Sequence, residues 1–289
     1  MSTLQTAEFQ LQQGEDGATN KHYNQDVQLF RLFLDSTLKY SSGLYMSDSD
    51  SLDTAQQQKL DFIAEQLGAS SGKRFLDIGC GWGSLVLHLA KNYDCEVVGL
   101  TPAPRQAEFI RARAAEFGVG DLVQIQVTHF QETSFSARSF DGMSMVGSIV
   151  HMFNKPAVLA ECYRLCKRKG RVYLSESCYR NQAKHDDFES RPGSRYVSRD
   201  IFGWGDMVPL STYVRGFEDA GFSLVGLRDL TADYHTTIEA WRANTLARSE
   251  EFEAIEKGST ERYVRYFETA NAGWGYTTKH YALTASRSR

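Results

Sequence analysis

The sequence lacks the features of a membrane-spanning, secreted or disulfide-linked protein. No apolar run approaches the roughly 18 residues that cross a bilayer, and the N-terminus has no charged-then-apolar signal pattern. The five cysteines are odd in number and widely spaced, which is typical of a reducing compartment rather than a disulfide framework. We therefore expect a cytoplasmic protein.

Metal ligands and basic tracts are also scarce. Cys162 and Cys166 lie one helical turn apart, but no nearby histidine or cysteine completes a metal site. The net charge is -4, and the sequence contains no block of lysine and arginine. Both features argue against nucleic acid as a partner. The sequence predicts a protein that uses neither a metal nor a nucleic acid.

Strand and helix patterns alternate from residue 73 onward. Apolar strands are expected at 74–78, 95–100, 122–127, 140–146 and 171–177, with helices at 84–92, 104–117 and 156–168. Such strands with helical connections indicate a doubly wound α/β fold with a mostly parallel sheet. Helices at 22–38 and 52–67 are expected to form an N-terminal cover. Residues 1–20 are polar, and we expect either a flexible tail or an arm that orders against a partner subunit of a homo-oligomer.

The alternation is interrupted between residues 178 and 209. This segment is rich in aromatics, shows no clear period and is too long for an ordinary connection, so we expect an inserted lid. The expected elements then resume as a helix at 210–220, a strand at 223–229, a helical pair across 235–271 and a strand near 275–285. Polar residues interleaved among aromatics suit the last strand for an antiparallel edge position.

The strand at 74–78 leads directly into a glycine-rich turn, Asp77-Ile78-Gly79-Cys80-Gly81-Trp82-Gly83. Glycines permit positive φ and close approach to a ligand, and the next helix offers unpaired N–H groups. The spacing is G-x-G-x-G instead of the G-x-G-x-x-G of dinucleotide-binding enzymes, and the second strand ends in Leu100-Thr101 without an acid. Asp77 suits an ammonium group and would repel a pyrophosphate. The turn therefore favours a ligand with an amino-acid end over a dinucleotide.

Several blocks of the sequence resemble one known family. They are HYNQDVQLFRLFLDSTLKYSSGLY, AQQQKLDFI, LDIGCGWGSL, VVGLTPAPRQ and YHTTIEAW. The family is that of the cyclopropane fatty-acid synthases and mycolic acid methyltransferases, and the resemblance covers nearly the whole chain. The block SFDGMSMVGSIVHMFN is similar as well to methyltransferases of natural-product pathways. The resemblance implies a Rossmann-like class I methyltransferase over residues 21–289, with S-adenosylmethionine as cofactor.

The resemblance also implies a set of cofactor contacts. From the methionine end to the adenine they are Tyr40, Ser41, Gly79, Gly81, Gly83, Val146, Leu100, Thr101, Gln106, Phe130 and Gln131, in addition to Asp77 of the glycine turn. The match is loose at Phe130 and Gln131. An ordinary core position remains the alternative for Tyr40.

The bicarbonate-binding residues of that family are mostly replaced here. By the resemblance, Ser42 stands in place of a cysteine, Val150 in place of a glutamate and Ser175 in place of a histidine, whereas His151 and Tyr234 are kept. Loss of an acid and a histidine from one small pocket should abolish bicarbonate binding. We therefore expect no closure of a cyclopropane ring.

Two chemistries remain open for the acceptor, which we expect to be a small apolar natural product. The first is methylation of an alkene carbon, as in a prenyl or terpenoid chain, with aromatic faces stabilising the carbocation. A prenylated indole alkaloid of the teleocidin kind is one such acceptor. The aromatic residues available for this role are Tyr23, Tyr179, Tyr196, Phe202, Trp204 and Tyr234.

The second chemistry is methylation of a hydroxyl or amine of a secondary metabolite. It requires a general base, for which His151 is the first candidate and Glu176, at the end of the fifth expected strand, is the second. A structural histidine and a solvated glutamate are the alternatives at these positions. A third hypothesis is a cofactor-binding regulatory protein without catalysis.

Overall fold

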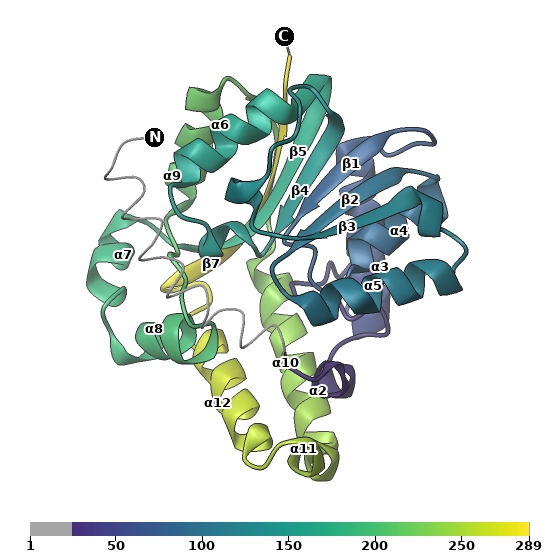
Figure 1. The fold of residues 1–289 in the computed structure, drawn as a ribbon. Coiled ribbons are helices and arrows are strands. Elements are labelled where there is room, and N and C mark those ends of the chain that lie inside the picture. The colour runs from purple at the N-terminus through teal and green to yellow at the C-terminus, as the bar shows by residue number, and fades with distance from the viewer. Residues whose placement is uncertain (1–24, 289) are drawn as a thin grey trace.

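The computed structural model describes residues 25–288. The arm at 1–20 and the candidate substrate residue Tyr23 lie outside these residues. One sheet of seven strands organises the fold, in the order β3-β2-β1-β4-β5-β7-β6 (Figure 1). The strands are β1 (Arg74–Ile78), β2 (Glu96–Thr101), β3 (Val123–Val127), β4 (Phe140–Val146), β5 (Cys166–Tyr179), β6 (Ser223–Asp229) and β7 (Thr278–Ser286).

The sheet is mostly parallel, which confirms the doubly wound α/β fold. β1 to β5 pair in parallel, whereas β7 runs antiparallel to both β5 and β6. β7 lies between these two strands, so the edge position expected for the last strand belongs to β6. Ala282, Leu283 and Ala285 are buried, which explains why this strand occupies an interior place.

Helices cover both faces of the sheet (Figure 1). On one face, α3 (Leu52–Leu67), α4 (Ser84–Tyr93) and α5 (Pro104–Glu116) pack their apolar sides against the strands. On the other face, α6 (Lys155–Leu165) and α9 (Leu210–Ala220) do the same. The helices expected from periodicity at these places are confirmed, because each buries a continuous apolar stripe.

A third cluster of helices lies at the carboxyl end of the sheet, in the lower part of Figure 1. It consists of α2 (Val27–Phe33), α10 (Thr231–Ala247), α11 (Ser249–Ile255) and α12 (Ser259–Asn271). Its centre is aromatic: the Phe33 ring lies 6.0 Å from that of Trp241 and 5.5 Å from that of Phe267. α2 is shorter than the helix expected at 22–38, since the chain becomes extended at Leu34. Where a helical pair was expected, Gly258 at positive φ separates α11 from α12 and makes three helices.

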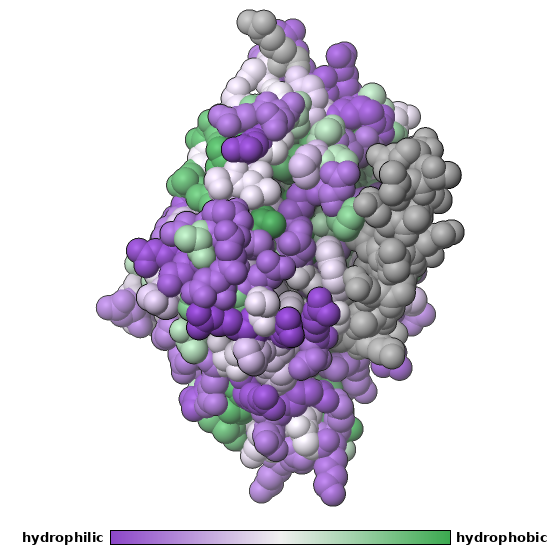
Figure 2. All heavy atoms as spheres, turned by 90° about the vertical axis from the view of Figure 1, so that its left-hand side faces the viewer, coloured by the Kyte–Doolittle hydropathy of each residue, from purple (hydrophilic) through white to green (hydrophobic). Residues whose placement is uncertain are grey.

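The segment at 178–209 contains three helical pieces, whereas its sequence shows no clear period. β5 continues to Tyr179, and α7 (Gln182–Phe188), α8 (Pro192–Arg195) and the π-helical turn η4 (Tyr196–Ile201) follow. Neither α7 nor α8 buries a residue, so neither requires an apolar stripe in its sequence. Figure 2 shows that this side of the molecule is mostly hydrophilic.

Candidate cofactor-binding site

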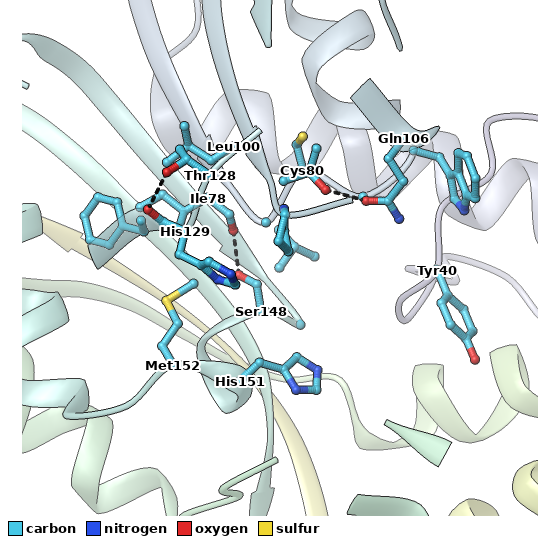
Figure 3. Close-up of a pocket in the computed structure, with 18 of the residues that line it drawn as sticks. Tyr40, Ile78, Cys80, Leu100, Gln106, Thr128, His129, Ser148, His151 and Met152 are labelled. Carbon is cyan, nitrogen blue, oxygen red and sulfur yellow. Dashed lines mark hydrogen bonds between the residues drawn. The ribbon is translucent and has the colours of Figure 1, made fainter. Parts of the chain in front are cut away.

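A pocket opens at the carboxyl ends of β1, β2 and β4 (Figure 3). The strand order reverses between β1 and β4, and ligands bind at such switch points of doubly wound sheets. Each strand contributes its last residue and the residues that follow it: Ile78 and Gly79 after β1, Thr101 and Pro102 after β2, Val146 and Gly147 after β4.

Most of the residues expected to contact a cofactor line this pocket. They are Tyr40, Gly79, Gly81, Leu100, Thr101, Gln106, Phe130, Gln131 and Val146. They come from the N-terminal segment, the glycine turn, the end of β2, the start of α5, the turn η2 (Phe130–Glu132) after β3, and the end of β4. Segments far apart in the sequence therefore meet around one cavity.

Three further candidates lie behind the lining of the pocket. The Ser41 hydroxyl accepts a hydrogen bond from the Lys59 ammonium at 2.8 Å. Gly83 precedes α4, and a Cβ there would come within 2.5 Å of the Ile110 side chain, so this glycine serves helix packing. Asp77 is buried directly before the lining residues of the turn.

The glycine turn presents bare backbone to the cavity. Gly79 and Gly81 have φ values of 78° and 55°, which non-glycine residues rarely adopt. A Cβ at Gly79 would lie 2.5 Å from the Cβ of Ser148, which excludes any side chain there. A Cβ at Gly81 would meet no atom of the described chain within 4 Å, so the turn leaves open space for a ligand at this residue.

One oxygen of the Asp77 carboxylate has a hydrogen-bond partner, and the other has none among residues 25–288. Oδ1 accepts a hydrogen bond from the Ser144 hydroxyl at 2.7 Å. Oδ2 is buried and has no hydrogen-bond partner among residues 25–288. Burial raises the pKa of Asp77, whereas Lys39 and the Ser144 hydrogen bond oppose that shift. A ligand ammonium near Oδ2 would supply the missing donor.

Gln106 is oriented for a polar ligand group. The Thr101 hydroxyl donates a hydrogen bond to Gln106 Oε1 at 2.6 Å and accepts one from the Ala103 amide at 3.1 Å. With its oxygen held in this way, the Gln106 side chain offers its NH₂ group as a donor. A sugar hydroxyl is a suitable acceptor for that group.

Sequence reasoning missed several residues that line the pocket. They include Lys39, Cys80, Trp82, Ser84, Thr128, His129, Glu132, Ser148 and Met152. A signal existed for Thr128, His129 and Ser148, because these residues follow the carboxyl ends of β3 and β4. No signal pointed to Lys39, since lysines are seldom buried.

His151 lines the pocket from the turn η3 (Ile149–His151), and Figure 3 shows it and Tyr40 entering from different segments. Its Nδ1 lies 2.7 Å from the backbone oxygen of Trp204. A carbonyl oxygen only accepts, so Nδ1 donates and Nε2 is the acceptor nitrogen of the neutral ring. Burial lowers the pKa of His151 to about 4, which keeps the ring neutral at pH 7.

The segment at 178–209 contacts the pocket through His151. The Phe202 ring lies 5.6 Å from the imidazole, and Trp204 contributes its backbone oxygen, but neither residue lines the pocket. Tyr196 instead donates to the backbone oxygen of Arg262 at 3.3 Å. Tyr179 is buried at the end of β5, with its ring 5.3 Å from that of His185.

Glu176 is buried and Tyr234 is half-buried, and both lie outside the pocket lining. Glu176 Oε2 accepts from the Val150 amide at 3.2 Å, and Oε1 accepts from the Ser177 amide at 2.9 Å. The glutamate thereby holds the turn that carries His151. The Tyr234 ring lies 4.6 Å from that of His280, whose Nε2 is 2.9 Å from the Ser175 hydroxyl.

Burial raises the pKa of Glu176 from its ordinary value of 4.5 to about 7. Between these values the folded chain holds a proton that the unfolded chain releases, so the free energy of unfolding should fall as the pH rises. The loss should amount to about 3 kcal/mol over this range. We expect Glu176→Gln to remove this part of the pH dependence, measured by urea unfolding between pH 4.5 and 7.5. If the free energy of unfolding depends on pH in the same way in both proteins, the prediction is contradicted. The pKa shifts of His151 and His280 are present in both proteins, so they cancel in the difference between the two curves.

The described part of the chain contains no group of three or more His, Cys, Asp or Glu side chains arranged to hold a metal ion. Between residues 25 and 288, no helix is both long and apolar enough to cross a membrane.

Comparison with known proteins identifies the family. The mycolic acid cyclopropane synthetase family model matches residues 11–281. A cyclopropane-fatty-acyl-phospholipid synthase of Escherichia coli is 31% identical over 86% of this chain and 60% of its own length. A "probable fatty acid methyltransferase" of Pseudomonas putida is 28% identical over 86% of this chain and 63% of its own length. This chain thus spans a little over half the length of these relatives.

A solved structure shows the same fold. The mycolic acid cyclopropane synthase CmaA1, complexed with SAH and CTAB, superimposes with a TM-score of 0.85 and 23% identity, over 93% of this chain and 97% of that chain. This likeness shows the fold, and the family model over residues 11–281 establishes that the chain belongs to the mycolic acid cyclopropane synthetase family.

Proposed function

We propose that this chain transfers a methyl group from S-adenosylmethionine to an alkene carbon of a small apolar acceptor. The observation that carries the proposal is the set of groups at the pocket and directly behind its lining. Asp77 has an unsatisfied carboxylate oxygen behind the lining, Gly81 presents open backbone, and Gln106 offers an oriented amide. The buried ring of Phe130 completes the set.

These groups fit the parts of S-adenosylmethionine. Asp77 suits the α-ammonium, Gly79 and Gly81 leave room for the methionine chain, and Gln106 offers a donor to the ribose. Phe130 supplies an apolar surface for the adenine, and Val146, at the end of β4, lies where the sulfonium would rest. The cofactor itself supplies an activated methyl group, so the chain needs mainly to position the two partners and exclude water.

The surroundings of His151 favour an apolar acceptor. The aromatic rings of Tyr40 and Trp82 line the same pocket as His151. Aromatic faces of this kind stabilise a carbocation by about 2 kcal/mol when they are desolvated. Methylation of an alkene generates such a cation, whereas methylation of a hydroxyl group does not.

The basicity of His151 also favours carbon as the methyl acceptor. Because burial lowers its pKa to about 4, the imidazole is a weak base. Hydrogens next to a cationic carbon are strongly acidic, and a weak base is sufficient to remove one of them. Deprotonation of an alcohol before methyl transfer requires a stronger base. Methylation of oxygen or nitrogen remains the second candidate, because His151 does line the pocket.

The proposal is tested by methyl transfer from labelled S-adenosylmethionine. The purified chain is incubated with panels of prenylated indoles, terpenoid alkenes, unsaturated fatty-acyl lipids and hydroxylated or amino analogues, and the methyl position is found by NMR. We expect label on a carbon of an alkene acceptor. Label found only on oxygen or nitrogen would overturn the assignment to carbon, and cofactor binding without transfer to any acceptor class would favour the regulatory alternative.

A further inference from the structure

A buried lysine lines the pocket and has no ion-pair partner among residues 25–288. Lys39 precedes Tyr40 and is only 6% exposed. No carboxylate within residues 25–288 lies within 4.0 Å of its ammonium. The Lys39 backbone amide is held by Asp35 Oδ1 at 2.8 Å, which fixes where the side chain starts. A buried cation in such a position calls for an anion.

Asp77 carries the complementary charge near the same pocket. Its Oδ2 is the buried oxygen without a hydrogen-bond partner in the described chain. Burial lowers the pKa of Lys39 and raises the pKa of Asp77, and the opposite charge of each side chain opposes the shift of the other, but the two form no ion pair within 4.0 Å. A ligand with one anionic and one cationic group would satisfy both residues.

We propose that Lys39 binds the α-carboxylate of the cofactor, opposite Asp77, which faces the α-ammonium. This inference rests on the proposed function, and it assigns a role to a residue that the sequence motifs did not single out. Lys39 and Asp77 together select the zwitterionic amino-acid end of the ligand.

Because the ligand carries groups of both charges, this inference predicts that Lys39 strengthens the binding of one ligand and weakens the binding of another. S-adenosylmethionine carries a sulfonium, an ammonium and a carboxylate. Lys39 repels the first two groups and attracts only the third. Without the carboxylate, the ligand is purely cationic, and the lysine weakens its binding. A lysine that only stabilises the fold would affect both ligands alike.

The test is calorimetric titration of the full chain with S-adenosylmethionine and with its decarboxylated form. Lys39→Met should weaken binding of S-adenosylmethionine by at least about tenfold. The same variant should bind decarboxylated S-adenosylmethionine as tightly as the unaltered chain, or more tightly. Lys39→Arg should retain the preference for the carboxylate, and Lys39→Gln provides a second neutral variant if the methionine variant folds poorly.

Lys59 offers a matched control. It is as deeply buried, but its ammonium donates to the Ser41 hydroxyl at 2.8 Å and it does not line the pocket. Lys59→Met should leave the ratio of the two affinities unchanged. If Lys39→Met weakens both ligands equally, or neither, the assignment of Lys39 is overturned. If the unaltered chain binds neither ligand, the proposed function itself is overturned.

Discussion

Replacing Gly81 by leucine should lower the affinity for S-adenosylmethionine by at least about a hundredfold, equivalent to about 3 kcal/mol. The leucine side chain would extend into space where a Cβ meets no atom of the described chain within 4 Å. Since Gly81 lines the pocket, that space is the volume we assign to the ligand. The affinity is measured by calorimetric titration of the variant.

Gly118 provides the control for this substitution. Its φ is 69°, a Cβ there also meets no described atom within 4 Å, and it does not line the pocket. Gly118→Leu should therefore carry a similar backbone strain, about 1–2 kcal/mol of stability, without loss of affinity. Equal affinities of the two variants would show that the open space at Gly81 is not part of the binding site.

Replacing His151 by alanine should lower the turnover of the alkene acceptor by about a hundredfold, the usual contribution of a positioned proton acceptor. The affinity for S-adenosylhomocysteine should stay within about threefold, because His151 acts on the acceptor and not on the donor. The residual product should carry its double bond at another position, since a different hydrogen is lost. Single-turnover kinetics and NMR of the product measure these changes.

A second pocket histidine serves as the control. His129 follows β3 and lines the pocket next to Phe130, on the side that we assign to the adenine. We expect His129→Ala to change the affinity for the cofactor and to leave the product distribution unaltered. If His151→Ala slows turnover only a few-fold with an unchanged product, His151 has a structural role.

The glycine turn that lines the pocket was predictable from the sequence, for a steric reason. Gly79 and Gly81 are required by positive φ and, at Gly79, by the close approach of Ser148. Positions of this kind strongly favour glycine, so the motif preserves the geometry directly. The central strands were predictable as well, because burial on both faces demands continuous apolar runs.

The remaining features depend on contacts that local sequence does not encode. α7 and α8 bury no residue, so no apolar period marks them. The interior place of β7 depends on pairing with β5 and β6, which lie far away in the sequence. Glu176 was predicted as a candidate base, but its two carboxylate oxygens accept from the backbone of Val150 and Ser177, so its evident role is to hold the turn of His151.

A crystal structure of the full chain with S-adenosylhomocysteine tests the central claim most directly. We expect the amino-acid end between Lys39 and Asp77, the ribose hydroxyls at Gln106 and the adenine against Phe130. The ligand backbone should pass over Gly81. Electron density for the ligand in any other cavity would contradict the assignment of this pocket. So would a protein side chain that fills the space at Gly81 while the ligand is bound elsewhere.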